Sequence, residues 1–162
     1  MHPLAVRTHQ QLAVRSQIEN LESSLHEEID SGRIEQTIVN CKEDNSQAHH
    51  YFGDGVYCRS LLIPKNTVVV GHLHKQARVC IIAQGTCTFV DEFRKETVSA
   101  PWIGEFKAGS KTVVLAHEDT LWVACLGTDE KDADVIVGEL LAEDHQDYER
   151  YLMQLEHHQE DK

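Results

Sequence analysis

The 162-residue sequence has no long apolar run, and aromatic residues make up only 6% of it. A membrane-spanning helix needs about 20 consecutive apolar residues, and no segment of that kind is present. The first residues, "MHPLAVRTHQQL", lack the apolar core of a signal peptide. We therefore expect a protein with no membrane partner that is not secreted through a signal peptide.

Basic residues are scarce as well. The chain has 15 Lys and Arg residues against 27 Asp and Glu residues, which gives a net charge of −12. Much of the excess lies from Asp129 onward, where there are 12 acidic and 3 basic residues. An acidic surface repels phosphate backbones, so we expect no nucleic-acid partner. The acidic end either keeps the protein soluble or attracts a basic protein partner or divalent cations.

Several chemical motifs are missing. The five cysteines are an odd number without a CxxC pair, which argues against a disulfide framework or zinc ribbon and favours a reducing compartment. There is no G-x-S-x-G, P-loop, G-x-G-x-x-G or H-E-x-x-H motif. Hydrolase, nucleotide-binding and zinc-protease functions are therefore unsupported, and we predict no catalytic residue.

Helices are expected at both ends of the chain. Residues 1–32 predict an amphipathic helix whose apolar residues recur at helical spacing: Val14, Ile18, Leu21 and Leu25. This narrow stripe packs either on the chain's own domain or on other copies in an oligomer. Residues 33–55 indicate a linker or loop with one short strand, and residues 142–162 predict an acidic C-terminal helix and tail.

Residues 56–141 have a different pattern, with short β-rich runs separated by turn residues. The runs recur about every 8–12 residues, as in an antiparallel sandwich or barrel. The last of them is "DVIVGEL", residues 134–140. No long helical pattern separates the runs, which argues against a parallel βαβ arrangement. The spacing thus predicts a mainly β fold, either an antiparallel sandwich or a small barrel.

Two histidines follow a run of valines in "PKNTVVVGHLHKQARVCIIAQG". Because side chains alternate along a strand, Val68, Val70, His72 and His74 should share one face, and the valines indicate that it is the inner face. Two imidazoles on that face can hold zinc, iron, nickel, copper or manganese, but each metal requires a third protein ligand.

This stretch resembles the first signature of the cupin superfamily. His72 and His74 match its H-x-H pair, and Gly85 matches its closing glycine. Arg78 occupies the position of the glutamate ligand, however, and Thr112 that of the third histidine in the second signature. The resemblance implies a single cupin-like β-barrel, or jelly roll, with a degenerate metal site, since an arginine repels a metal ion.

Almost the whole chain is similar to small cupin-like proteins encoded by tailed bacteriophages. The shared motifs are "HYF", "GVYCR", "IPKNT", Gly71 with "HK", "AP", "GSK" and "EDTLW", in that order. This resemblance implies a phage protein in the host cytoplasm or the virion. The two amphipathic helices and the barrel edges favour a homo-oligomer, with other phage or host proteins as further partners.

Three functional hypotheses are compatible with these observations. The first is a non-catalytic phage protein without a cofactor, either a virion component or an accessory binding module that acts as a homo-oligomer. The second is a metal-dependent cupin enzyme, of oxygenase or sugar-phosphate isomerase type, in which His72 and His74 bind a divalent transition metal.

The third hypothesis is a metal-free pocket in which Arg78, His72 and His74 bind a small anion. The alternative for Arg78 is a place at the barrel mouth, paired with an acidic residue. Trp102 is a candidate for the pocket rim or for an interface.

Overall fold

A computed structural model describes residues 7–34 and 48–160 of the chain. The helices are α1 (His9–Asp30), α2 (Ala133–Leu140) and α3 (His145–Glu160). The strands are β1 (Ala48–Gly53), β2 (Val56–Ile63), β3 (Val68–His74), β4 (Arg78–Gln84), β5 (Thr86–Val90), β6 (Lys95–Ser99), β7 (Trp102–Phe106), β8 (Lys111–Ala116), β9 (Thr120–Gly127) and β10 (Leu141–Ala142). None of the described helices is long and apolar enough to cross a membrane.

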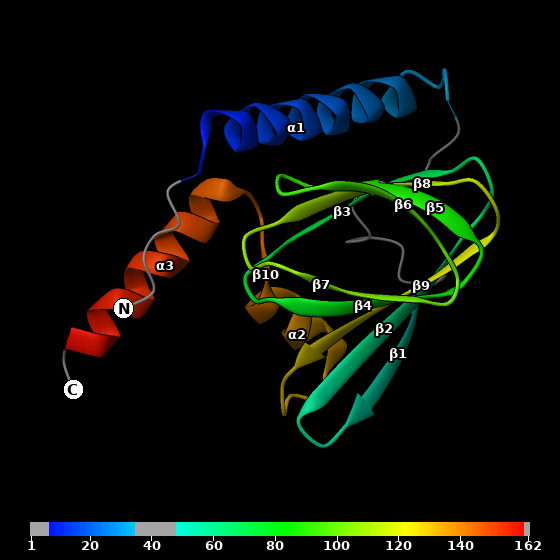
Figure 1. Cartoon of the computed structure of the whole chain (residues 1–162). Helices are drawn as coiled ribbons and strands as arrows, with labels where there is room; N and C mark the ends of the chain where they lie inside the picture. The colour runs from blue at the N-terminus through cyan, green and yellow to red at the C-terminus, as the bar shows by residue number, and fades with distance from the viewer. Residues whose placement is uncertain (1–6, 35–47, 161–162) are drawn as a thin grey trace.

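The strands form two antiparallel sheets that face each other (Figure 1). One has the order β1-β2-β9-β4-β7 and the other the order β10-β3-β8-β5-β6. Without the outer strands β1 and β10, the orders β2-β9-β4-β7 and β3-β8-β5-β6 are those of an eight-stranded jelly roll. The prediction of a mainly β jelly roll with a helix at each end is confirmed.

The core lies between the sheets at the end where aromatic rings gather. Phe89 and Phe106 are almost fully buried, with ring centroids 5.1 Å apart. Trp122 meets Phe106 edge-on at 5.7 Å, and Trp102 lies 5.4 Å from Phe89. Edge-on and tilted contacts of this kind add to the hydrophobic gain from burying the rings. The rings fill one end of the barrel with side chains.

Helix α1 packs on the outer face of the β10-β3-β8-β5-β6 sheet, as Figure 1 shows. Ile18, in the middle of its apolar stripe, is buried against Val70 and Val113. Lys111 of β8 pairs with Glu22 of the helix. Of the two placements expected for the stripe, the structure shows the one on the chain's own barrel.

A single buried carboxylate connects both terminal helices to the barrel. Glu92, in the β5–β6 turn, pairs with Arg7 at 3.3 Å and with Arg15 of α1 at 3.1 Å. Its Oε1 also lies 2.9 Å from Nε2 of His145, the first residue of α3, and the opposite ring nitrogen of His145 lies 2.7 Å from Glu19. Helices far apart in the sequence therefore meet at one side chain.

The segment "DVIVGEL", expected to be a strand, is helix α2 instead, and that prediction is wrong. Asp132 caps the helix by accepting hydrogen bonds from the backbone amides of Asp134 and Val135. Ile136 and Leu140 lie one helical turn apart and are buried against β2 and β9. The spacing of the apolar residues in this run is compatible with a helix as well as with a strand. The N-cap at Asp132 favours the helix.

Candidate functional site

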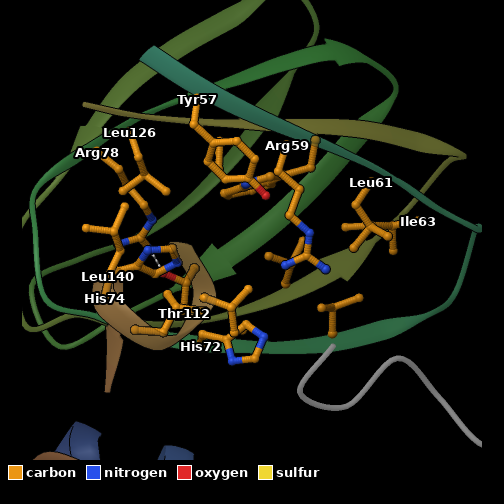
Figure 2. Close-up of a pocket in the computed structure, with 17 residues that line it drawn as sticks. Tyr57, Arg59, Leu61, Ile63, His72, His74, Arg78, Thr112, Leu126 and Leu140 are labelled. Atoms are coloured by element: carbon orange, nitrogen blue, oxygen red, sulfur yellow. Dashed lines mark hydrogen bonds between the residues drawn. The ribbon is translucent and has the colours of Figure 1, made fainter. Parts of the chain in front are cut away.

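A cavity of about 100 Å³ lies inside the jelly roll. Strands β2, β3, β8 and β9 form its walls, and Val137 and Leu140 of α2 lie at one end. Most of its lining is aliphatic or aromatic, and the polar exceptions are Tyr57, Arg59, His72, His74, Arg78 and Thr112. Figure 2 shows Tyr57 and Arg59 extending into the cavity from one side, with His72, His74 and Thr112 on the other.

The histidine pair points into this cavity, but not for the reason expected from the alternation. Val68 and Val70 face outward against α1, whereas Val69 lines the cavity. The register of β3 against β8 shifts between Val70 and Leu73, which is the signature of a β-bulge. A bulge adds one residue to a strand and turns the following side chains to the other face. His72 and His74 therefore point inward, and the prediction that Val68 and Val70 share their face is wrong.

His74 is held in its neutral form. Burial lowers its pKa well below the ordinary value, and the nearby charges of Arg78, His72 and Arg59 lower it further. Its buried Nδ1 has no hydrogen-bond partner among the described residues. His74 thus presents an unsatisfied polar atom to the cavity.

Arg78 is buried inside the barrel, with 6% of its surface exposed. It donates from Nη1 to Ser110 Oγ at 3.1 Å and from Nη2 to Thr112 Oγ1 at 2.9 Å. Its guanidinium also lies 4.9 Å from the centre of the Phe106 ring. Burial lowers the pKa of Arg78. No salt bridge to it occurs in the described chain, so its placement at the mouth beside an acidic residue is wrong.

Arg59 is a site residue that the sequence reasoning missed. It lies on β2, and Nε and Nη2 of its guanidinium are buried without a hydrogen-bond partner among the described residues. The signal was present in "VYCRSLLI", where alternation places Tyr57, Arg59, Leu61 and Ile63 on one face, and all four line the cavity. The cavity therefore contains two guanidinium groups and no carboxylate in its lining.

The predicted residues do not all come together. His72, His74 and Arg78 line one cavity, whereas Trp102 does not line it and packs on the aromatic core. Trp122, by contrast, belongs to both the cavity wall and the core. His50, on β1, contacts the hydroxyl of Tyr57 through Nδ1 at 2.7 Å.

A metal of the cupin type does not fit this donor set. Two imidazoles converge on the cavity, but no cluster of three or more His, Cys, Asp or Glu side chains suited to a metal occurs in the described part of the chain. The charged groups in the lining are the cations of Arg78 and Arg59, which repel a positive ion. The two histidines alone provide too few ligands.

Comparison with known proteins adds a general likeness of fold. No family model and no curated protein matches the sequence. The solved structures that resemble it include KdgF from Halomonas sp., at 12% identity and a TM-score of 0.45 over 52% of this chain and 79% of that one. A cupin-2 domain containing protein from Shewanella frigidimarina has 11% identity and a TM-score of 0.43 over 61% and 89% of the two chains.

A third similar structure is the DMSP lyase DddQ from Ruegeria pomeroyi, with 13% identity and a TM-score of 0.46 over 53% of this chain and 48% of that one. At such identities and TM-scores the likeness extends to the overall arrangement of strands and no further.

Proposed function

We propose that this chain is a non-catalytic binding module that holds a small anion, a carboxylate or a phosphate, inside its jelly roll without a metal. The observation that carries the proposal is the guanidinium of Arg59, which has two buried nitrogens without hydrogen-bond partners among the described residues, in a largely apolar cavity. Buried donors without partners cost free energy, and an anion that accepted hydrogen bonds from them would remove that cost.

The neighbouring groups support an anion rather than a cation. Arg78 is fixed by Ser110 and Thr112 and contributes a second positive charge at a defined place. The unpaired Nδ1 of His74 can donate a hydrogen bond to an oxygen in one of its tautomers. Since guanidinium groups match carboxylate and phosphate oxygens geometrically, these are the two ligand chemistries that we propose.

The size and lining of the cavity narrow the choice. Pockets for drug-sized ligands are about 300–1,000 Å³, and this one is about 100 Å³. The aliphatic lining suits a ligand with a short apolar body, such as a short-chain carboxylic acid, and inorganic phosphate is the smallest phosphate to consider.

The phage setting and the homo-oligomer remain predictions that rest on the sequence. In that setting, anion binding would make the protein an accessory binding module rather than a virion component. The apolar stripe of α1 is packed on the chain's own barrel. One of the surfaces on which the prediction of a homo-oligomer was based is therefore already covered. The metal-dependent enzyme is the weaker candidate, because Arg78 and Thr112 replace two of its ligands.

A thermal-shift titration tests the proposal. Protein without a histidine tag is melted with inorganic phosphate and with a series of short-chain carboxylates, all at the same ionic strength. A ligand that binds the folded state raises the melting temperature as its concentration rises. We expect at least one of these anions to do so with the natural chain, and not with Arg59→Met.

Arg150→Met is the matched control, because Arg150 lies on α3 with its side chain 62% exposed. It should keep the full ligand-dependent shift. No shift with any anion of the series, or an equal shift in Arg59→Met, would overturn the proposal.

A further inference from the structure

Two cysteines lie directly opposite each other on neighbouring strands. Cys58 of β2 and Cys125 of β9 are register partners in the antiparallel ladder. Their sulfur atoms are 3.0 Å apart, although 67 positions separate the residues in the sequence. Side chains that oppose each other in this way are the closest neighbours that a sheet provides.

The pair lies on the outer face of its sheet. The adjacent residues Arg59 and Ala124 line the inner cavity, so alternation directs Cys58 and Cys125 outward. Both cysteines are half-buried. Among the described helices, α1 covers the opposite sheet and α2 packs on inward-facing side chains at the end of the cavity, as Figure 1 and the contacts show. A small oxidant can therefore reach the two sulfurs.

Two other described cysteines provide a contrast. Cys80 and Cys87 are fully buried in the aromatic core. Burial raises the pKa of Cys87 to about 11, so its thiol stays protonated and behaves as a small apolar group. Accessibility thus separates the cysteines into one surface pair and two core residues.

We propose that Cys58 and Cys125 form a dithiol that peroxide oxidises reversibly to an intramolecular disulfide. One thiolate attacks hydrogen peroxide, breaks its O–O bond and becomes a sulfenic acid, with release of one water molecule. The second sulfur then attacks the sulfenic sulfur, and the sulfenic oxygen leaves as a second water. In total, two thiols lose two electrons and two protons, and one peroxide becomes two waters.

The backbone geometry allows this bond without unfolding. Residues directly opposite each other in an antiparallel pair have Cα atoms about 4.5–5.5 Å apart, within the range of about 4.4–6.8 Å that disulfides span. This is the short end of the range, and strained or exposed disulfides are the readily reduced ones. The crosslink is therefore expected to be reversible rather than a permanent structural bond.

Protonation sets the speed of the reaction. Burial and the neighbouring Cys58 sulfur raise the pKa of Cys125 to about 12. At neutral pH this thiol keeps its proton, which slows its attack, because the thiolate is the reactive form. The crosslink should therefore respond to sustained peroxide more than to a brief exposure.

The test uses the full chain with Cys41→Ser, which removes the cysteine outside the described residues. The folded protein is treated with hydrogen peroxide, alkylated and digested without reduction, and the peptides are analysed by mass spectrometry. We expect a peptide pair that joins Cys58 to Cys125 and weighs two hydrogens less than its separate parts. Dithiothreitol should release both thiols.

Matched variants and the core cysteines serve as controls. With Cys58→Ala or Cys125→Ala, the remaining surface cysteine should proceed to sulfinic acid, and Cys80 and Cys87 should stay unmodified throughout. Sulfinic acids at both Cys58 and Cys125 without a crosslink would overturn the proposal. So would a crosslink that appears only when Cys80 and Cys87 are oxidised to the same extent, because the reaction would then belong to unfolded chains.

Discussion

Arg78 donates a hydrogen bond from Nη2 to Thr112 Oγ1 at 2.9 Å, and these two residues occupy the positions of a glutamate and a histidine ligand in the cupin signatures that the sequence resembles. Where those signatures would supply two metal ligands, this chain has a guanidinium and a hydroxyl that bond to each other. Each of the two side chains satisfies the other inside the barrel.

Placing the ligands of the cupin signature at both positions should create a metal site. We expect Arg78→Glu combined with Thr112→His to bind about one zinc or nickel ion per chain, because the two new ligands would join His72 and His74 to make four. The measurement is metal content by mass spectrometry after dialysis, on protein without a histidine tag. The natural chain should retain far less than one ion.

Adding His74→Ala to the double variant tests whether the metal binds at the designed site. This change should reduce the bound metal substantially. Equal metal content in the natural chain and the double variant would contradict the ligand arrangement inferred from the register.

The inward direction of the histidine pair could be predicted from the sequence, but its cause could not. Because Val68 and Val70 face outward against α1, a regular strand would also have turned His72 and His74 outward. The bulge between Val70 and Leu73 reverses the parity. A bulge depends on how β3 pairs with β8, which is distant in the sequence, so no local pattern reveals it.

The strand order, helix α2 and Arg59 also show what the sequence alone does not reveal. The strand order follows from long-range pairing, so the β-rich runs and their spacing predict only a sandwich or small barrel, and the jelly roll was implied by the resemblance to cupins. Helix α2 was missed because its apolar run fits both periods, and Asp132 at its N-cap was the available signal. Arg59 was missed because an arginine within an apolar alternation suggests a solvent-facing residue, whereas here it faces a cavity.

Removing the guanidinium of Arg59 should stabilise the protein in the absence of a ligand. Two of its nitrogens are buried without a hydrogen-bond partner in the described part of the chain, and Arg59→Met replaces the group by an apolar side chain in an apolar wall. We expect the free energy of unfolding to rise by about 1 kcal/mol in buffer without the candidate anions, because a desolvated group is removed. Urea denaturation followed by circular dichroism measures the change.

The control is again Arg150→Met, on the exposed side of α3, which should change stability by less than about 0.5 kcal/mol. A clear loss of stability in Arg59→Met would mean that the guanidinium is well satisfied in the folded protein.

Gly85 is expected to be intolerant of any side chain. Its φ angle is +82°, and an added Cβ would lie 2.4 Å from the backbone oxygen of Asp119. Gly85→Ala should therefore lower the free energy of unfolding by about 2 kcal/mol or more, through strain and a contact with backbone that cannot move aside.

Gly138→Ala is the matched comparison, since nothing lies within 4 Å of its added Cβ in helix α2. That change should stabilise the protein by about 0.5–1 kcal/mol, and similar losses in both variants would contradict the prediction.

Glu92 should be the carboxylate on which both terminal helices depend. Glu92→Gln leaves Arg7 and Arg15 without their buried partner and weakens the contact with His145. We expect a loss of about 2 kcal/mol, since hydrogen bonds to charged groups contribute more than neutral ones. Glu28→Gln, which removes an exposed pairing with Arg33, should have little effect. Equal effects of the two substitutions in urea denaturation would rule out this role.

The contribution of Glu92 should disappear in acid. Burial alone would raise its pKa, but the hydrogen bonds from His145 and Arg15 and the charge of Arg7 outweigh burial and lower the pKa below 4.5. A carboxyl group whose pKa is lower in the folded than in the unfolded state stabilises the fold above the unfolded value, and this stabilisation is lost as the pH falls through the folded value. The difference in unfolding free energy between the natural chain and Glu92→Gln should therefore shrink as the pH falls below 4.5. The comparison cancels the titration of the other carboxylates, which both proteins share. A difference that stayed constant to the lowest pH at which both proteins fold would show that Glu92 acts through shape rather than charge.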